Sequence, residues 1–218
     1  MKDDPLIQLR EHLKFYREIG VSFLKVEGKK ERLLALEKET LSCRRCSLWK
    51  TRTKLVFGAG SPDAELMLIG EAPGYNEDKE GLPFVGQAGK LLNRILAAIN
   101  LSRKEVYIAN VLKCHPPGNR DPKPEEREAC KPFLLKQIEI IKPKIILALG
   151  AHAARTLLET EAPISALRGR VWYFAGIPLI ATFHPGFLLR NPGRKRDVWE
   201  DVKKVRAFLD EGRFPDEG

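Results

Sequence analysis

Four short apolar runs, separated by stretches with helical spacing, constrain the fold of this chain more than any other feature of its sequence. Each run is continuous enough in apolar residues to form a parallel strand that is covered on both faces. The runs cover 65–70, 105–112, 144–150 and 177–183, and the helical stretches cover 87–100, 124–141, 151–160 and 196–210. The alternation predicts a fold of the α/β class, a three-layer α/β/α sandwich with a central four-stranded parallel sheet.

This architecture also predicts where the functional site lies. In open α/β sheets a ligand binds beyond the carboxyl ends of the strands. The loops that begin at Gly70, Asn110, Gly150 and Phe183 should therefore share one rim. The peptide "GEAPGYNEDKEGLPF" leaves the first strand at that rim.

The length of 218 residues is enough for one sizeable domain. We expect a helical N-terminal extension over 1–42, a main domain over 43–210 and a short tail over 211–218. Within the extension, apolar residues at helical spacing predict two amphipathic helices that are interrupted around Gly28. Packing or a partner contact is the role expected for them.

The composition favours a polyanionic partner. The chain has 38 Lys and Arg against 29 Asp and Glu, a net charge of +9, and a pI near 9.4, which makes nucleic acid a candidate. It has no run of about 20 apolar residues and no signal peptide, so we expect a cytoplasmic protein. Charged residues reach 31% while Gln and Asn are few, a balance that predicts a thermophilic source.

Four cysteines predict a metal site. Cys43 and Cys46 form a Cys-x-x-Cys pair in a basic loop, whereas Cys114 and Cys130 are widely separated. In a cytoplasmic chain this arrangement favours metal over disulfides or free thiols. Four thiolates hold either structural zinc or a [4Fe-4S] cluster, and the wide second pair favours the cluster. His115 is a rival ligand, with an ordinary loop role as the alternative.

The loop over 70–84 carries groups that suit a flat polar ligand. The turn at Gly70 presents backbone N–H groups, but the loop lacks the GxxxxGK[ST] and GxGxxG patterns, which argues against nucleoside triphosphates and dinucleotides. Glu71 and Glu77 add carboxylates, and Phe84 follows a polar loop, where its ring can stack on a ligand. The alternatives are solvated charges and a Phe folded into the core.

Two more polar side chains stand at strand ends. Asn110 ends the second strand, and its amide offers one acceptor and two donors, enough to read an edge of a pyrimidine. His184 follows the fourth strand. Each residue alone is unremarkable, but with Phe84 they form a base-binding set at three strand ends.

These residues lie in motifs that closely resemble those of the family 4 uracil-DNA glycosylases, the iron-sulfur branch found mainly in thermophiles. The matching motifs are "CRRCSLWKTRTKLVFGAGSPDAELMLIGEAPGYNEDKEGLPFVGQAGKLL", "VYIANVLKCHPPGNRDPKPEE" and "HPGFLLRNPGRK". The resemblance covers nearly all of residues 43 to 210. It implies flipping of uracil out of DNA and hydrolysis of its N-glycosidic bond, the first step of base excision repair.

The resemblance also implies roles for site residues. Phe84 would stack on uracil beside the Gly70 turn, Asn110 would read N3–H and O4, and His184 would stabilise charge at O2. Glu71 and Glu77 would lie near the sugar, the water and the C5 edge, with Glu77 shaping the site against the methyl group of thymine. All of these belong to the catalytic or uracil-binding set.

Two comparisons with other uracil glycosylases limit what the resemblance implies. The best-known uracil glycosylases carry an Asp that activates water where this chain has Ala72, so leaving-group stabilisation should carry more of the rate. Some relatives capture uracil covalently through a His in the loop after the second motif. The corresponding span, "PPGNRDPKPEE", has no His, and we expect turnover without a stable covalent adduct.

The resemblance further implies that the four cysteines bind a [4Fe-4S] cluster with a structural role. Basic residues near the cluster and in "ALRGR", which contains Arg168, are expected on the DNA face. The loop after His184 would supply an apolar wedge and phosphate contacts through Leu188, Leu189, Arg190, Arg194 and Lys195.

The partners that follow are uracil-containing single-stranded and double-stranded DNA. The protein is expected to be a monomer. A sliding clamp is a further candidate partner, although no short motif supports it. The rival interpretations are an inactive DNA-binding iron-sulfur protein on the same fold and a glycosylase with a different base preference.

Overall fold

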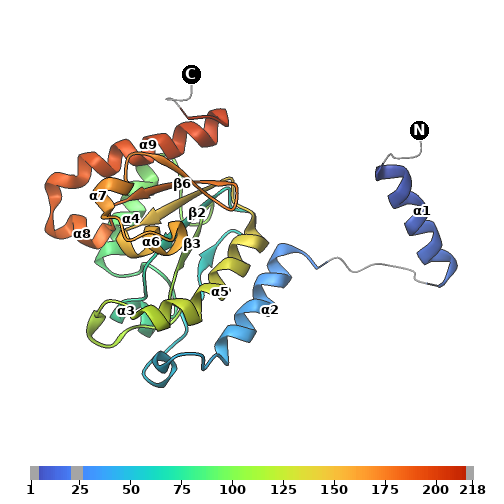
Figure 1. Ribbon diagram of the computed structural model, residues 1–218, viewed down its shortest axis with the longest axis horizontal. Helices are drawn as coiled ribbons and strands as arrows, with labels where there is room; N and C mark the ends of the chain where they lie inside the picture. The colour runs from blue at the N-terminus through green and yellow to red at the C-terminus, as the bar shows by residue number, and fades with distance from the viewer. Residues whose placement is uncertain (1–4, 21–26, 215–218) are drawn as a thin grey trace.

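The computed structural model describes residues 5–20 and 27–214 (Figure 1). The described residues contain a six-stranded sheet with the order β1-β3-β2-β4-β6-β5. Its four central strands are parallel, as predicted: β3 (Tyr107–Asn110), β2 (Leu66–Gly70), β4 (Ile145–Leu149) and β6 (Ile177–Thr182). Nearly every residue in these strands is buried, which explains their continuous apolar sequence.

Two antiparallel edge strands extend the sheet beyond the prediction. They are β1 (Ala59–Gly60), which pairs with β3, and β5 (Val171–Phe174), which pairs with β6. β1 is too short to produce a sequence pattern. β5 is half-buried or exposed along its length, so the continuous apolar run of a central strand is not required there.

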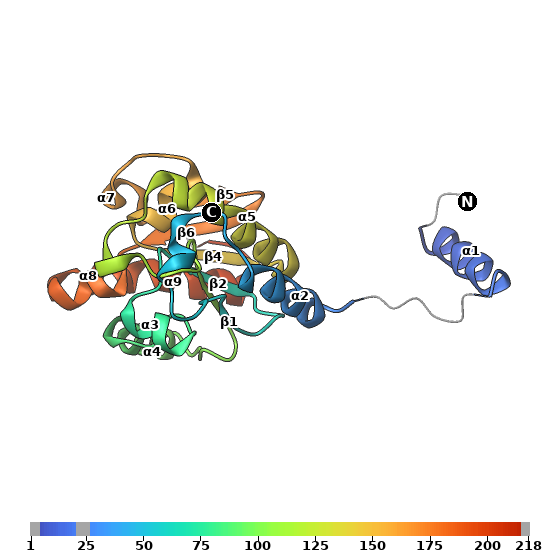
Figure 2. The same cartoon turned by 90° about the horizontal axis from the view of Figure 1, so that it is seen from below.

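Helices cover both faces of the sheet, which confirms the three-layer sandwich (Figure 2). One core lies between the sheet and α2 (Lys29–Leu41), α5 (Pro124–Ile141) and α6 (Ala151–Leu158). The other lies between the sheet and α4 (Gln87–Ala98), α8 (Pro185–Arg190) and α9 (Lys195–Glu211). The short helices α3 (Tyr75–Glu80) and α7 (Ile164–Leu167) lie in connecting segments.

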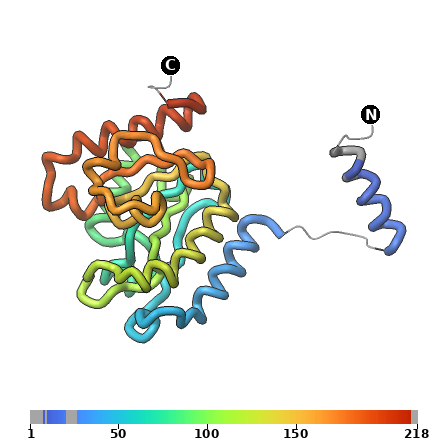
Figure 3. Tube along the Cα trace, viewed as in Figure 1, coloured from blue at the N-terminus to red at the C-terminus, as the bar shows by residue number. Residues whose placement is uncertain are grey.

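The predicted helices in the N-terminal extension are α1 (Pro5–Glu18) and α2. α2 runs along α5 (Figure 3), where Leu33 and Leu36 are buried and Lys29 Nζ donates to Ile141 O at 2.8 Å. Packing is therefore a role of α2. Residues 21–26 between the helices, and residues 215–218 of the predicted tail, lie outside the described residues. Within the described part of the chain, no helix combines the length and apolar character needed to span a bilayer.

Candidate uracil-binding and catalytic site

The ends of β2 and β3 bring three of the predicted residues together. Gly70 and Asn110 are paired in register on neighbouring strands. A methyl group built on Gly70 would lie 2.4 Å from Asn110 Oδ1 and 2.7 Å from Phe84 Cζ. The amide and the ring therefore both lie against the glycine, and only the absence of a side chain at position 70 leaves room for them.

Asn110 has an unsatisfied acceptor. Its side chain is 2% exposed, and its Oδ1 has no hydrogen-bond partner. A buried polar atom without a partner costs about 1–3 kcal/mol, and such atoms are rare in native structures. This acceptor is thus positioned for an N–H group that arrives with a ligand.

Phe84 is held in an unusual backbone conformation. Its φ is 53°, in the left-handed region that bulky residues rarely occupy. Arg103 fixes this turn from outside by donating to Phe84 O at 2.9 Å and Pro83 O at 2.6 Å. The Phe84 ring lies 5.5 Å from the His184 ring, centroid to centroid, so the turn serves to bring the aromatic ring to the strand ends.

His184 is a neutral hydrogen-bond donor in this structure. The backbone N–H of Gly186 donates to His184 Nδ1 at 3.0 Å, which places the ring proton on Nε2. Burial, assisted by the charge of Arg190, lowers the pKa of His184 to about 4. The imidazole is therefore uncharged at neutral pH and offers Nε2–H.

Glu77 supports the loop that carries Phe84. Its Oε1 accepts from the N–H groups of Val85 at 2.9 Å and Gly86 at 3.0 Å. These are the residues directly after Phe84, at the start of α4. Glu77 therefore helps to position Phe84, because it holds the backbone of the two residues that follow it.

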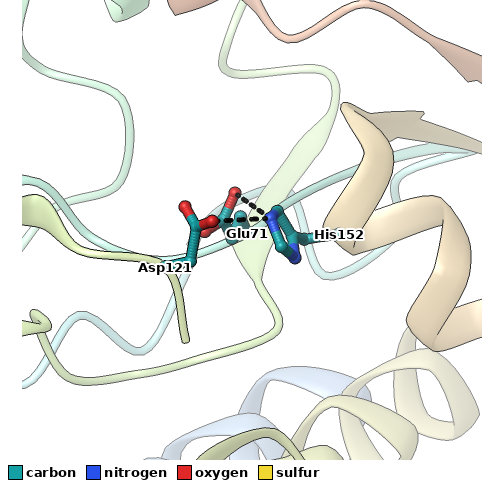
Figure 4. A group of neighbouring side chains, drawn as sticks. All are labelled: Glu71, Asp121 and His152. Atoms are coloured by element: carbon teal, nitrogen blue, oxygen red, sulfur yellow. Dashed lines mark ion pairs between the residues drawn. The ribbon is translucent and has the colours of Figure 1, made fainter. Parts of the chain in front are cut away.

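Glu71 lies in a group with Asp121 and His152 (Figure 4). His152 Nε2 is 3.9 Å from Glu71 Oε2 and 3.7 Å from Asp121 Oδ2. Burial, and secondly the charge of Asp121, raise the pKa of Glu71 to about 7. Burial lowers the pKa of His152. Glu71 is the carboxyl group of the site whose charge changes near neutral pH.

The crowding at Gly70 leads to a prediction. We expect Gly70→Ala to displace Asn110 and Phe84 and to lower kcat/KM for uracil release by about 10-fold or more, since overpacking costs about 1–3 kcal/mol. Single-turnover release from a uracil-containing oligonucleotide measures the effect. In the control Gly28→Ala the added methyl meets only the Glu31 side chain. Equal rates for both variants would contradict the prediction.

The four cysteines form a second site beside the first. All are free thiols, and all line one cavity between the 43–55 segment and α5. Two N–H groups point at sulfur: Arg52 Nη1 lies 3.3 Å from Cys114 Sγ, and the backbone N of Lys113 lies 3.3 Å from Cys130 Sγ. Such donors are typical of sulfur that carries negative charge. His115 Nε2 instead lies 2.9 Å from Asn119 Oδ1.

Lys113 connects the cysteine site with Asn110. Its side chain is completely buried, and Nζ donates to Asn110 O at 2.7 Å and Gln137 Oε1 at 2.6 Å. A buried ammonium is costly unless negative charge lies nearby. The neighbouring sulfur atoms are the source of such charge when they are thiolates.

The DNA-facing residues divide into exposed and buried ones. Leu189 is 46% exposed, and Arg190, Arg194 and Lys195 are exposed. Leu188 is 1% exposed, which corrects its assignment to a wedge, because the α8 turn directs it into the core. Leu189, which is exposed, is the leucine of this pair that could act as the wedge.

Arg168 is also unavailable for phosphate. Its guanidinium donates to both carboxylate oxygens of the buried Asp201, at 3.1 and 2.9 Å. Asp201 also accepts from Thr182 Oγ1 at 2.6 Å. This network ties the end of β6 to α9, and corrects the expectation that Arg168 lies on the DNA face.

Three residues beside the site were not predicted from the sequence. His152 could have been predicted, because it lies in the first turn of α6, two residues after Gly150 at the predicted rim. Asp121 and Lys113 gave no usable signal. A lone acid in a loop and a lysine beside a cysteine are common, and only the tertiary structure brings them to Glu71 and Asn110.

Fold and site together define an α/β protein that gathers a buried amide, an aromatic ring and a neutral imidazole at the carboxyl edge of its sheet. The family profile described as "Uracil DNA glycosylase superfamily" matches residues 57–203. The chain belongs to this superfamily, and its similarity to curated proteins places it with the type-4 enzymes.

Three curated relatives, each named type-4 uracil-DNA glycosylase, show the extent of the similarity. The protein of Sulfurisphaera tokodaii is 46% identical over 79% of this chain and 83% of its own length. That of Archaeoglobus fulgidus is 45% identical, over 80% and 92%. That of Thermotoga maritima is 44% identical, over 83% and 96%. The relatives come from thermophiles, in keeping with the charge-rich composition.

Proposed function

We propose that this chain is a monofunctional uracil-DNA glycosylase that hydrolyses the N-glycosidic bond of uracil in DNA and leaves an abasic site. Its membership of the type-4 enzymes supports uracil excision in DNA repair. The structural observation that most supports the proposal is the buried Oδ1 of Asn110, which has no hydrogen-bond partner and lies near Phe84 at the end of β2.

Asn110 reads the base by its hydrogen-bond pattern. Its Oδ1 accepts from N3–H of uracil while its amide nitrogen donates to O4. Cytosine presents the opposite pair, an acceptor at N3 and a donor at N4, so the same amide would face two mismatched contacts. Phe84 stacks on the flipped base.

His184 acts on the leaving group. As the bond between C1′ and N1 breaks, its electron pair moves into the uracil ring and negative charge grows at O2. Nε2–H of the neutral imidazole donates to that oxygen, and the Gly186 N–H holds the ring in place. No proton transfer from His184 is required.

Glu71 acts on the sugar side. Loss of the base leaves an oxocarbenium-like sugar, which a carboxylate stabilises; water then adds to C1′ and its proton ends on the departing uracil anion. Ala72 supplies no acid–base group, so Glu71 is the carboxylate for this step. The 116–126 loop contains no His that could capture uracil covalently. We therefore expect no covalent adduct between the protein and uracil-containing DNA on a denaturing gel.

The cysteine residues suit a [4Fe-4S] cluster. A tetrahedral zinc site with Zn–S bonds of about 2.3 Å needs sulfur atoms about 3.8 Å apart. Among the described residues, no three cysteine sulfurs all lie within 4.8 Å of one another. All four cysteines line one cavity, and the ligands of the cluster would be Cys43, Cys46, Cys114 and Cys130. Glycosidic hydrolysis transfers no electrons, so the bound cluster would supply structural cross-linking.

Further parts of the proposal concern DNA and cellular context. Leu189 would enter the base stack while Arg190, Arg194 and Lys195 contact phosphates, which would make affinity fall with salt. We propose that the enzyme acts as a cytoplasmic monomer on single-stranded and double-stranded DNA. A sliding-clamp contact and the division at residues 42 and 210 stay predictions.

The decisive experiment measures free uracil released from a labelled oligonucleotide, with Asn110→Ala and a cytosine substrate alongside. We expect release by the wild type, none from cytosine, and a loss of about 100-fold or more in the variant, since polar groups built to read a substrate contribute several kcal/mol. No release by folded, cluster-loaded protein would favour an inactive DNA-binding protein. Release of hypoxanthine instead would indicate a different base preference.

A further inference from the structure

We propose that Asp121 is a positioning residue for Glu71: its carboxylate, placed across His152, sets whether Glu71 meets the substrate sugar as a carboxylic acid or as a carboxylate. The inference rests on the proposed function, because Glu71 acquires this role only in glycosidic cleavage. Asp121 lies in the 120–123 segment before α5 and does not belong to the base-binding set.

The geometry places three ionisable groups from three chain segments in one place. Glu71 directly follows β2, and His152 lies in the first turn of α6. One carboxylate oxygen of Glu71, one of Asp121 and one ring nitrogen of His152 all lie within 4.8 Å of one another. Figure 4 shows His152 Nε2 facing both carboxylates. His152 Nδ1 is buried without a partner, which favours the tautomer that carries its proton on Nε2.

The position of Asp121 is fixed by its neighbour. Arg120 donates to both oxygens of Glu126, at 2.8 and 2.6 Å, and Glu126 is 1% exposed. Glu126 also accepts from Lys123 N at 2.9 Å. This anchor holds the segment against the start of α5, while the Asp121 side chain itself is 82% exposed. Asp121 can therefore be changed without disturbing the core.

The charged groups around Glu71 act in opposite directions. Asp121 favours the protonated acid, while Arg127 from α5 favours the carboxylate. His152 from α6 faces both carboxylates and is itself influenced by Arg155 and Glu161. Because burial and, secondly, the charge of Asp121 raise the pKa of Glu71 to about 7, a small change in local charge alters its ionisation at neutral pH. Asp121 is the negative neighbour that keeps Glu71 partly protonated.

The test is the pH dependence of uracil release in single turnover at low salt, for the cluster-loaded wild type and Asp121→Asn. The wild-type rate should rise with pH through about 7, because Glu71 acts as a carboxylate. In Asp121→Asn the acidic limb should move to lower pH by about half to one unit, the effect of one nearby unit charge in a solvent-rich site. At pH values well above this limb, wild type and Asp121→Asn should release uracil at the same rate.

Glu125→Gln is the matched control. It removes one negative charge four residues away in sequence, on an exposed side chain that pairs with Lys123. An unmoved limb in Asp121→Asn, an equal displacement in Glu125→Gln, or an active wild type without an acidic limb would overturn the proposal. A merely structural role of Asp121 would lower the rate without moving the limb.

A second measurement separates this inference from the proposed function. Carbon-13 NMR of glutamate-labelled protein without DNA follows the Glu71 carboxyl directly, with Glu71→Gln identifying its signal. Its titration should move to lower pH in Asp121→Asn. If the wild type released no uracil, the proposed function would fail while this titration still tested the coupling. An unchanged titration would overturn the coupling itself.

Discussion

Replacing His184 with alanine is expected to lower kcat for uracil release by about 100-fold to 1,000-fold, with a smaller change in KM. The size of this fall in kcat follows from the loss of one preorganised hydrogen-bond donor to a developing anion, which costs about 3–4 kcal/mol in comparable sites. The donor matters most in the transition state, since charge at O2 grows only as the bond breaks. Single-turnover and steady-state rates on the same uracil-containing oligonucleotide measure the two effects.

The structure also predicts how His184 responds to pH. Because its pKa is lowered to about 4, it stays neutral at higher pH and should contribute no limb to the rate profile between about pH 5 and 8. His12→Ala, on the exposed surface of α1, is the matched control and should leave the rate unchanged. A His184→Ala variant with wild-type kcat would refute the assignment. So would a wild-type rate that falls with rising pH near neutrality, if this limb disappeared in the variant, since it would identify an imidazolium as the active form.

Replacing Cys43 with alanine is expected to cause the largest loss of stability. Losing one of the four proposed ligands should release the proposed cluster, remove its visible absorption and deprive the buried Lys113 ammonium of the negative charge at Cys130. An uncompensated buried charge costs about 3–5 kcal/mol. For a chain of this size that lowers the thermal midpoint by roughly 10 °C or more.

Uracil release should fall with it, because Lys113 Nζ also holds the backbone of Asn110. Thermal melting, iron and sulfide content, DNA affinity and uracil release are measured together. Ser42→Ala, the adjacent residue, retains all four thiols and serves as control. If Cys43→Ala destroyed catalysis while fold, thermal midpoint and DNA affinity stayed intact, the structural role of the cluster would be wrong.

Several of these residues could be located from the sequence because the carboxyl ends of parallel strands lie at the same edge of a sheet. The apolar runs predicted the four parallel strands, and the rule for open α/β sheets placed Gly70, Asn110 and His184 on one edge. The structure brings Asn110 and Phe84 together over Gly70, with the Phe84 ring beside His184. The edge strands β1 and β5 were missed because neither has the continuous buried pattern of a central strand.

Contacts between side chains distant in sequence required the tertiary structure. Leu188 and Arg168 were assigned to the DNA face from the family resemblance, but the turn of α8 buries Leu188, and Asp201 of α9 pairs with Arg168. The proximity of Asp121 to Glu71 likewise depends on the path of the 115–123 segment. Hydrophobic periodicity carries no information about such pairings.

The sequence alone thus determined the layers, the strand ends and the placement of Gly70, Asn110 and His184 at those ends, because the periodicity of apolar residues and local turn chemistry are short-range properties. Only the tertiary structure decided the tautomer of His184, the unsatisfied state of Asn110, the buried link through Lys113 and the ionisation of Glu71. Each of these depends on burial and on charges brought from distant parts of the chain, and both are set by packing.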